Sequence, residues 1–455
     1  MNLEVVILAA GQGKRMKSAK SKVLHEIAGK PMLHHVIETA QRLNSQKTHI
    51  IYGHGGEQVR QSIDDPQIDW TEQTDQLGTG HAVKQVLPVL SEDSLVLILF
   101  GDVPMISHST LENLIKEVND QQMALLTIDM QDPTGYGRII RNSDNNIIRI
   151  VEHGDATEQE RAVTEINTGI MAVGGRQLKK WVSNIKNDNK QSEYYLTDII
   201  EMAVNDQVTV KGVSTDDEVE VTGINDKIQL QKIERAHQLR QAEELMRNGV
   251  TLADANRIDI RGKLTAGQDV SIDINVICEG EVTIGDRSVI GPNVILRNVS
   301  IADDVTIHAN SVLEDARVGS GSRIGPFARI RPETELSDNT HIGNFVEIKK
   351  TTVGQGSKIN HLSYVGDSEI GSGVNIGAGT ITCNYDGANK FKTVIGDNVF
   401  VGSDSQLVAP VTIGDGATIG AGSTITRDTP DNKLTLSRSK QISIDNWQRP
   451  VKTKK

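Results

Sequence analysis

The hydrophobic positions of this chain follow two different periods. Up to about Gly223, short apolar runs such as VVILAA, LVLILF and GIMAVG alternate with stretches of mixed polarity such as KPMLHHVIETAQRLN. Apolar strands separated by helical stretches are typical of a parallel sheet that is covered on both faces. This part of the sequence therefore predicts an α/β domain.

A different period begins after about Leu252. Aliphatic residues recur six positions apart, with occasional steps of five, as in Val318, Ile324 and Ile330, and this continues to Ile425. A helix would need a period of about 3.6, and hairpins would need turn signals every eight to twelve residues. The six-residue period instead indicates a parallel β-helix, in which three short strands form one coil and one aliphatic residue of each strand points inward.

One helix is predicted between these two parts. The stretch NDKIQLQKIERAHQLRQAEELMRNGV is rich in long polar residues, has apolar positions at Ile233 and Leu239, and ends before Gly249. The expected regions are an α/β domain over 1–224, a linker helix over 225–249 and a β-helix with a carboxyl-terminal segment over 250–455.

Length and charge narrow the function classes. A chain of 455 residues suggests two or three domains. Its net charge of -12 argues against a nucleic-acid-binding protein, which needs a basic surface. No apolar run approaches the length of a membrane span, and no basic segment precedes the first apolar run, so we expect a cytoplasmic protein that does not contact membranes. Cys278 and Cys383 are far apart in sequence, which favours free thiols.

The six-residue period also predicts which polar side chains meet. Residues about 18 apart should lie one strand spacing apart at the same corner of the β-helix. Arg331 follows the third aliphatic position of its coil and Lys349 follows that of the next, and we expect Tyr364 and Asn384 to continue this column. Two stacked cations repel by about 3 kcal/mol at an effective dielectric constant of 20. A bound phosphate would relieve this repulsion, and the alternative is that both side chains spread into solvent.

A histidine and an insertion lie close to this corner. His361 is in the turn that leads to it. A lone histidine is usually a surface or turn residue, but beside a cationic column it becomes a candidate base. The repeat is interrupted between Thr382 and Ile395, which are thirteen positions apart where five or six are expected. Insertions in solenoids form external loops, often on the binding face, and Lys390 of this loop would extend the cationic patch.

The amino-terminal part contains a glycine-rich turn and a carboxylate at a strand end. LAAGQGKRM has glycines at Gly11 and Gly13 but matches neither a Walker A loop nor a complete dinucleotide-binding fingerprint. Such a turn still presents backbone N–H groups and the basic pair Lys14 and Arg15 to phosphates. Asp102 ends the buried run LVLILFGD, where a carboxylate is either a magnesium ligand or a turn cap.

Taken together, these motifs resemble the bacterial family of bifunctional enzymes that combine N-acetylglucosamine-1-phosphate uridylyltransferase and glucosamine-1-phosphate N-acetyltransferase activities. The resemblance covers nearly the whole chain. It depends on LAAGQGKRM, QLGTGHAV, FGDVP, GYGRI, INTGI and VTGIND in the first half, and on RIRPETEL, GNFVEIKK, INHLSYVGD, NIGAGTITCNYDGANKFKT and LSRSK in the second. It implies a Rossmann-like nucleotidyltransferase domain, the linker helix and a left-handed β-helix acetyltransferase domain.

The resemblance implies roles for residues of the uridylyltransferase site. The expected nucleotide-binding residues are Leu8, Gly11, Gly13, Arg15, Lys22, Gln73, Gly78 and Thr79, the last three at the uracil. The expected sugar-phosphate-binding residues are Gly137, Glu152, Asn167, Thr197 and Asn225, and the expected magnesium ligands are Asp102 and Asn225. One position departs from the family pattern, because Lys14 replaces the usual threonine before Arg-Met.

The resemblance implies a second set of roles in the β-helix. His361 would be the general base of acetyl transfer. The aminosugar phosphate would be bound by Arg331, Lys349, Tyr364, Asn375 and Lys390, and acetyl-CoA by Ala378, Asn384, Tyr385, Ser403, Ala421 and Arg438. The family further implies Mg²⁺ as cofactor, UTP and acetyl-CoA as co-substrates, acetyl transfer before uridylyl transfer, and a homotrimer.

Two other functions stay open from the sequence. In the first, the chain is a nucleotidyltransferase whose β-helix only assembles or regulates it, and the NHLSY motif with the inserted loop argues against this. In the second, the chain is a non-catalytic assembly protein, and the presence of Lys22, Asp102 and Asn225 argues against that.

Overall fold

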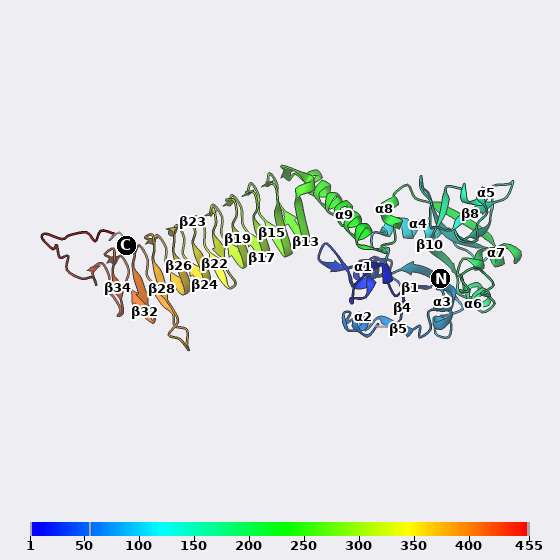
Figure 1. Cartoon of the computed structure of the whole chain (residues 1–455), viewed down its shortest axis with the longest axis horizontal. Coiled ribbons are helices and arrows are strands. Elements are labelled where there is room, and N and C mark those ends of the chain that lie inside the picture. Colours follow the sequence, from blue (N-terminus) through cyan, green and yellow to red (C-terminus); the bar gives the residue numbers. More distant parts are fainter. Residues whose placement is uncertain (1, 54–55, 453–455) are drawn as a thin grey trace. The chain divides into compact units, whose positions relative to one another are not determined.

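The computed structural model describes residues 2–53 and 56–452, and these form two compact units that divide between His237 and Gln238. The division falls inside helix α9 (Lys227–Arg247), so each half of the predicted linker helix belongs to one unit (Figure 1). In the described ranges, no helix has both the length and the apolar character that a membrane span requires.

The first unit is built on a nine-stranded sheet whose main path has the order β11-β7-β10-β6-β1-β4-β5. Its strands are β1 (Asn2–Ala9), β4 (Lys47–Tyr52), β5 (Ile68–Glu72), β6 (Ser94–Phe100), β7 (Gln122–Asp129), β8 (Arg138–Arg141), β9 (Ile147–Val151), β10 (Glu165–Gly174) and β11 (Thr209–Ser214). β1, β4, β5 and β6 pair in parallel, but β10 is antiparallel to β6 and β7. The expectation of a wholly parallel sheet is therefore wrong at β10. The chain reaches this strand from β9 through a short helix and not through a crossover helix.

Helices cover both faces of this sheet. They are α1 (Met32–Arg42), α2 (Glu57–Gln61), α3 (Thr79–Val86), α4 (His108–Lys116), α5 (Glu158–Arg161), α6 (Gly175–Val182), α7 (Asp198–Asn205) and α8 (Glu218–Val221), with short 3₁₀ turns at Lys14–Met16 and Lys22–Leu24 and a small hairpin of β2 (Glu26–Ile27) and β3 (Lys30–Pro31). Along β1, Val5 and Ile7 pack into the hydrophobic cluster on one face, and Val6 and Leu8 into the cluster on the other. Burial on both faces explains why this strand is a continuous apolar run.

The second unit is a parallel β-helix. Its strands stack coil upon coil from β12 to β35, and strands in successive coils pair in parallel, as Ile324 does with Ile342 and Ile342 with Ile359 (Figure 1). Residues that are 17 or 18 apart in sequence are therefore neighbours in space. Each coil thus has three walls, and each wall corresponds to one predicted six-residue repeat.

The strands of the β-helix fall into two ladders. The first contains β12 (Thr251–Leu252), β14 (Ser271–Ile272), β16 (Val289–Ile290), β18 (Thr306–Ile307), β20 (Arg323–Ile324), β23 (His341–Asn344), β25 (Lys358–His361), β27 (Asn375–Ile376), β30 (Phe400–Val401), β33 (Thr418–Ile419) and β35 (Leu434–Thr435). The second contains β13 (Ile258–Ala266), β15 (Val276–Ile284), β17 (Ile295–Ile301), β19 (Val312–Val318), β21 (Arg329–Ile330), β22 (Thr334–Leu336), β24 (Glu347–Val353), β26 (Tyr364–Ile370), β28 (Ile381–Cys383), β29 (Thr393–Ile395), β31 (Gln406–Val408), β32 (Val411–Ile413) and β34 (Thr424–Ile425).

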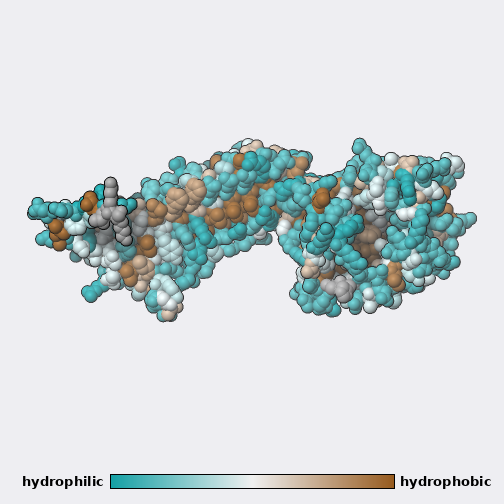
Figure 2. Space-filling view, in the orientation of Figure 1, coloured by the Kyte–Doolittle hydropathy of each residue, from teal (hydrophilic) through white to brown (hydrophobic). Residues whose placement is uncertain are grey.

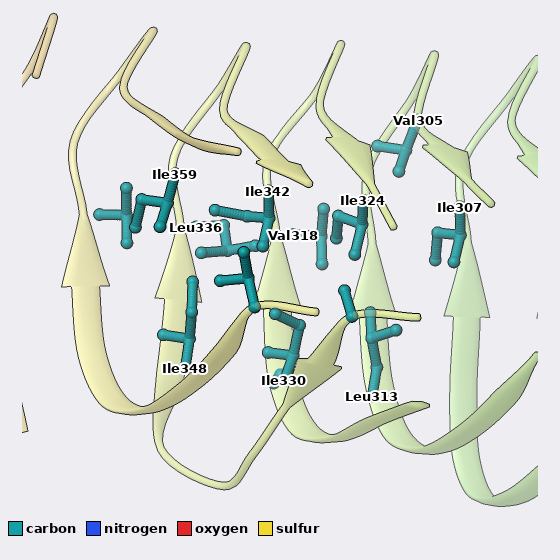
Figure 3. Close-up of a cluster of buried hydrophobic side chains, with 14 of the residues drawn as sticks. Val305, Ile307, Leu313, Val318, Ile324, Ile330, Leu336, Ile342, Ile348 and Ile359 are labelled. Atoms are coloured by element: carbon teal, nitrogen blue, oxygen red, sulfur yellow. The ribbon is translucent and has the colours of Figure 1, made fainter. Parts of the chain in front are cut away.

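The predicted aliphatic positions form the interior of this β-helix. Figure 3 shows side chains from the three walls of several coils meeting in one core. The buried columns include Ile307, Ile324, Ile342 and Ile359 from one wall, Leu313, Ile330 and Ile348 from a second, and Val318 and Leu336 from the third. Because each coil buries its side chains against the coils above and below, the fold fixes outward residues at defined corners.

Candidate active sites

A cavity of about 520 Å³ lies at the carboxyl ends of β1 and β6 in the first unit. The predicted residues among those that line it are Leu8, Gly11, Lys22, Gln73, Gly78, Thr79 and Asp102. Gly13 and Arg15 are not among the lining residues. Lys14, which the glycine-rich turn was expected to present to phosphates, also lines it, as does Gln76, which no motif indicated.

The glycine-rich turn allows Lys22 to approach the cavity. Gly13 has a φ of 59°, and a Cβ atom on it would lie 2.6 Å from the Cβ atom of Lys22. Only glycine accommodates both that backbone conformation and that approach. Lys14 follows directly and lines the cavity, so the residue that departs from the family pattern places a cation there.

Two side-chain oxygens converge on the ammonium of Lys22, which lines this cavity. The backbone N–H of Ile224 donates to the carbonyl of Asp102 at 2.9 Å, which holds Asn225 next to Asp102. The ammonium of Lys22 donates to Oδ2 of Asp102 and, at 3.2 Å, to Oδ1 of Asn225. Both oxygens therefore lie around one point that a cation can occupy. A carboxylate with an amide oxygen fits Mg²⁺, which keeps water and phosphate oxygens as its other ligands.

Asp102 and Asn225 would supply few ligands to a metal. Within residues 2–53 and 56–452, no group of three or more His, Cys, Asp or Glu side chains is arranged to hold a metal. A cation bound at Asp102 and Asn225 would thus need oxygen atoms from a substrate or from water to complete its coordination.

The predicted sugar-binding residues come together beside the β8–β9 hairpin. The N–H of Asn167 donates to the carbonyl of Gly137 at 2.9 Å, and the hydroxyl of Thr197 donates to Glu152 at 3.0 Å. A Cβ atom on Gly137 would lie 3.5 Å from the carboxylate oxygens of Glu152. Burial raises the pKa of Glu152. These four residues form one polar patch, whose groups can accept hydrogen bonds from sugar hydroxyls and donate hydrogen bonds to them.

One further carboxylate belongs to this patch. Burial, together with the nearby charges of Glu152, Glu201 and Asp155, raises the pKa of Asp198 to about 6. Asp198 follows Thr197 at the start of α7. The YYLTD motif contains it, but its sequence neighbours do not reveal that Glu152 and Asp155 lie nearby.

In the second unit, His361 is at the end of β25. Its Nδ1 atom lies 3.1 Å from Oδ1 of Asn344, in the strand below. An amide oxygen can only accept, so Nδ1 carries the ring proton. This leaves Nε2 with its lone pair, and the side chain is exposed to solvent.

The predicted phosphate-binding cations have carboxylate partners. Arg331 is paired with Glu347 at 2.7 Å and Lys349 with Asp367 at 3.9 Å. The sequence argument that Arg331 and Lys349 repel each other without compensation is therefore wrong. Lys390 adds a third cation from the inserted loop, and its ammonium lies close enough to lower the pKa of Lys349. The group carries one more positive than negative charge.

The observed strand register differs in one respect from the predicted column of polar side chains. Lys349 pairs in register with Gly366, and Tyr364 pairs instead with Glu347. Tyr364 reaches the corner through its side chain, because a Cβ atom on Gly366 would collide with the Tyr364 hydroxyl and lie 2.8 Å from Nδ2 of Asn384. The same Nδ2 atom is 3.4 Å from the Tyr364 hydroxyl. Gly366 thus leaves the space in which these two side chains meet.

The predicted coenzyme-binding residues form a second line. His361, Ala378, Ser403 and Ala421 occupy the same corner in successive coils, which are joined by backbone hydrogen bonds of 2.7 to 3.3 Å. Arg438 continues the line by donating from Nη1 to the carbonyl of Ala421 at 3.0 Å. This arrangement gives an extended ligand a path that starts at the imidazole.

Two predicted residues have no side-chain hydrogen bond to these groups in the described ranges. Asn375 is in β27 between Lys358 and Phe400, and Tyr385 is in the inserted loop, where its hydroxyl donates to the carbonyl of Gly387 at 2.6 Å. The backbone of Tyr385 does pair with that of Lys390, which belongs to the cationic group.

Hydrophobic side chains cover the corner below His361. Phe327, Phe345 and Leu362, which we call the apolar corner, are 50%, 56% and 66% exposed. All three have positive φ, and the two phenylalanine rings stack at 5.4 Å. Exposed hydrophobic residues are also visible along the β-helix in Figure 2. The sequence analysis missed this feature, although the signal was present as three apolar residues at turn positions.

Comparison with protein families agrees with both units. Residues 5–160 match the MobA-like NTP transferase domain. Residues 281–315 match the hexapeptide repeat of succinyl-transferase, and residues 392–427 match the bacterial transferase hexapeptide (six repeats).

Two curated relatives match along the whole chain. The bifunctional protein GlmU of Marinobacter nauticus is 55% identical over 99% of this chain and 99% of its own length. The bifunctional protein GlmU of Nitrosomonas eutropha is 56% identical over 100% of both. The chain belongs to the GlmU family.

Membership of the GlmU family confirms the predicted bifunctional enzyme. The chain is a uridylyltransferase and an acetyltransferase of UDP-N-acetylglucosamine synthesis, with nucleotide and acyl-CoA substrates and a divalent metal. It also confirms the fold class, an NTP transferase domain followed by a left-handed β-helix of hexapeptide repeats. The presence of a hexapeptide-repeat domain is consistent with an oligomer.

Proposed function

We propose that the cavity of the first unit binds UTP and that the corner around His361 binds glucosamine-1-phosphate and acetyl-CoA. In the cavity, Gln73, Gly78 and Thr79 hold the uracil. The triphosphate is bound by the turn at Gly11 and Gly13 and by Lys22 and Arg15, next to Leu8. Lys14 adds positive charge where the family pattern has a hydroxyl.

Uridylyl transfer needs charge neutralisation more than it needs a base. The phosphate oxygen of N-acetylglucosamine-1-phosphate attacks the α-phosphorus of UTP, and pyrophosphate leaves with the electron pair of the broken bond. Because this nucleophile is already ionised, the protein has to hold two anions in line and offset their charge. Lys22 and Arg15 do so, and the sugar is oriented by Gly137, Glu152 and Asn167 with Thr197.

Asp102 and Asn225 would hold the metal, which we assign as Mg²⁺. When bound, such an ion neutralises charge on the phosphoryl oxygens as a Lewis acid. The support for this assignment is that the two side-chain oxygens converge on the ammonium of Lys22, which shows that a cation fits between them.

For acetyl transfer, we assign His361 as the general base. Its Nε2 atom takes a proton from the amine of glucosamine-1-phosphate, the amine nitrogen attacks the thioester carbonyl, and the sulfur of coenzyme A leaves as thiolate. A positioned base of this kind contributes about 10²- to 10⁴-fold. The hydrogen bond from Nδ1 to Asn344 supports this role, because it leaves Nε2 free to accept the proton.

The cationic group beside His361 would bind the sugar phosphate. Arg331, Lys349 and Lys390 have an excess of one positive charge over Glu347 and Asp367, which favours an anion. Tyr364 and Asn375 would add hydrogen bonds. The acyl donor would follow the line of Ala378, Ser403, Ala421 and Arg438, with Asn384 and Tyr385 at its start.

The order of the reactions and the location follow from the substrates. We propose that acetyl transfer comes first, so that the uridylyltransferase site receives the acetylated sugar phosphate. UTP and acetyl-CoA are intracellular metabolites, which supports a cytoplasmic location.

The apolar corner supports a homotrimer in which a neighbouring chain completes the acetyltransferase site. Apolar residues at positive φ are uncommon, and each costs folding energy that burial in an interface would offset. Leu362 directly follows His361, so a chain that covers the apolar corner also reaches the site.

His361→Ala tests the second site, since the Nε2 atom that the hydrogen bond from Nδ1 to Asn344 leaves free is the observation on which the assignment depends. We expect coenzyme A release with glucosamine-1-phosphate as acceptor to fall by about 10²-fold or more. His341→Ala is the matched control, because His341 is in the preceding coil and outside the site, and its activity should stay at the wild-type level. Normal thioester consumption by His361→Ala would remove the base assignment.

A further inference from the structure

The side chain of Gln73 is held by two acceptors at the wall of the nucleotide cavity. Gln73 is 3% exposed, and its Nε2 atom lies 3.1 Å from the carbonyl oxygen of Gly78 and 3.1 Å from Nδ1 of His81. A carbonyl oxygen can only accept, so the atom facing Gly78 must be the amide nitrogen. The second amide proton then points to His81, and the Oε1 atom of Gln73 has no hydrogen bond among the described residues.

This arrangement fixes the tautomer of His81. A neutral imidazole has one donor and one acceptor nitrogen, so Nδ1 must be the acceptor that receives the second proton of Gln73. The ring is held in place by Tyr194, whose ring centroid lies 6.1 Å away. The backbone carbonyl of Tyr194 in turn accepts from Gly80 at 2.8 Å, which ties the start of α3 to the same segment.

Gln85 competes for the same ring. Its Nε2 atom lies 3.1 Å from Nε2 of His81 and donates to the carbonyl of His81 at 3.1 Å. Both glutamines cannot donate to one neutral imidazole, which has a single acceptor. We assign the hydrogen bond to Gln73 because its side chain is buried. A buried amide proton without an acceptor costs more free energy than one that can bond to water, as the proton of Gln85 can.

We propose that His81 is a specificity-determining positioning residue, which holds the Gln73 amide with Oε1 facing the base and thereby selects uracil over cytosine. This rests on the proposed role of Gln73 at the uracil. The N3 position of uracil carries a proton that Oε1 accepts, whereas N3 of cytosine is itself an acceptor and meets Oε1 without a proton between them. An amide that could rotate would instead present its NH₂ group to cytosine. A site built from fixed hydrogen-bonding groups rejects the wrong ligand because those groups are left unpaired.

The test compares UTP with CTP in two apolar variants. In His81→Phe and His81→Leu the acceptor is lost, and His81→Phe keeps a ring against Tyr194. We expect the ratio of kcat/KM for UTP to that for CTP to fall by roughly tenfold, the worth of about one hydrogen bond. In His81→Asn the side-chain oxygen can replace Nδ1 as acceptor, so the ratio should return toward the wild-type value. Gln85→Ala should leave the ratio unchanged, because it removes only the contact at the other ring nitrogen.

The controls separate this inference from the proposed function. Failure of the wild-type chain to use UTP would contradict the uridylyltransferase site itself, and it is measured first. Acetyl transfer is measured on each variant, and since its site is in the other unit it should not change. The role of His81 would be overturned if the apolar variants lost activity with UTP and CTP equally, so that the ratio of the two kcat/KM values stayed unchanged. It would also be overturned if the ratio fell as far in His81→Asn or in Gln85→Ala as in the apolar variants.

Discussion

At the scale of single residues, Lys22 occupies the point where the metal is proposed to bind. Its ammonium contacts both Asp102 and Asn225, the two residues proposed as oxygen ligands of the metal. A metal ion and this ammonium cannot both lie between the same two oxygens. Lys22 must therefore leave this position when the ion binds, and the phosphates of the nucleotide then offer it a new partner.

The competition predicts that Lys22→Met binds metal more tightly when no nucleotide is present. We expect the affinity for Mn²⁺, measured by calorimetry or by electron paramagnetic resonance, to rise by about tenfold, corresponding to one charge-assisted contact. Lys14→Met is the matched control, since Lys14 lines the same cavity without contacting Asp102 or Asn225, and its effect should be smaller. An unchanged or weaker affinity in Lys22→Met would contradict the competition.

Asp198 provides a prediction about stability and pH. Its pKa is raised to about 6 in the folded chain, against about 3.9 for an unperturbed aspartate, so the folded state favours the protonated carboxyl. The cost of the buried charge therefore appears as the pH rises from about 4 to about 6 and is fully present above that range. Asp198→Asn should be more stable than the wild type by about 1 kcal/mol at pH 8, allowing for solvent screening, and equally stable at pH 4.

This difference can be followed by urea unfolding with tryptophan fluorescence, because Trp70 and Trp181 are both in the first unit. Equal stabilities at pH 8 would show that the carboxylate of Asp198 is not destabilised by its surroundings.

The positions of single residues were predictable where a sequence motif fixes the backbone. They were less predictable where charged side chains of successive coils form ion pairs. Gly13 and Asp102 follow from a glycine-rich turn and a strand end, and Lys22 follows from the family resemblance. All three line or shape the cavity. Glu347 and Asp367 were missed as partners of Arg331 and Lys349, because outward carboxylates in a β-helix have the same sequence pattern whether they are solvated or paired.

At the scale of elements, the six-residue period predicts the β-helix well because every coil repeats the same burial. The direction of β10 was not predictable, since a buried strand has the same apolar pattern in parallel and antiparallel sheets when both its faces are covered. The inserted loop was located by the interruption of the period. The sequence showed the apolar corner only as three apolar residues at turn positions, and their positive φ became visible in the structure.

The apolar corner predicts opposite effects on the single chain and on its assembly. In the three coils with Asn275, Asn293 and Asn310, asparagine occupies this left-handed position, which it tolerates better than phenylalanine does. Phe327→Asn with Phe345→Asn should therefore favour the fold of each chain while weakening the proposed trimer. Acetyl transfer should fall with the assembly, and uridylyl transfer should persist.

Light scattering coupled to size-exclusion chromatography measures the mass, and Val289→Thr is a control at an exposed apolar residue of an earlier coil. A double variant with unchanged mass and unchanged acetyl transfer would show that the apolar corner is not an interface.

At the scale of the whole molecule, the two reactions are assigned to two separate units. The predicted nucleotide-, metal- and sugar-binding residues of uridylyl transfer lie within residues 8–225, and those of acetyl transfer within residues 331–438. Helix α9 contributes to both units, since Ile233 is buried in the first and Ala242 in the second. A cut after the helix should therefore leave the first unit intact.

A fragment of residues 1–249 should convert N-acetylglucosamine-1-phosphate and UTP at close to the full-length rate and should not release coenzyme A. Its pyrophosphate release can be compared with that of the full chain at the same concentration of sites. Loss of uridylyl transfer in a folded fragment would mean that the β-helix takes part in the first reaction.

The most direct test of two independent sites measures both half-reactions on Asp102→Ala and His361→Ala and then on their mixture. We expect Asp102→Ala to lose only uridylyl transfer and His361→Ala to lose only acetyl transfer, while the mixture makes UDP-N-acetylglucosamine from glucosamine-1-phosphate, acetyl-CoA and UTP. If either variant lost both half-reactions while remaining folded, or if the mixture made no product, the assignment of one reaction to each unit would be contradicted.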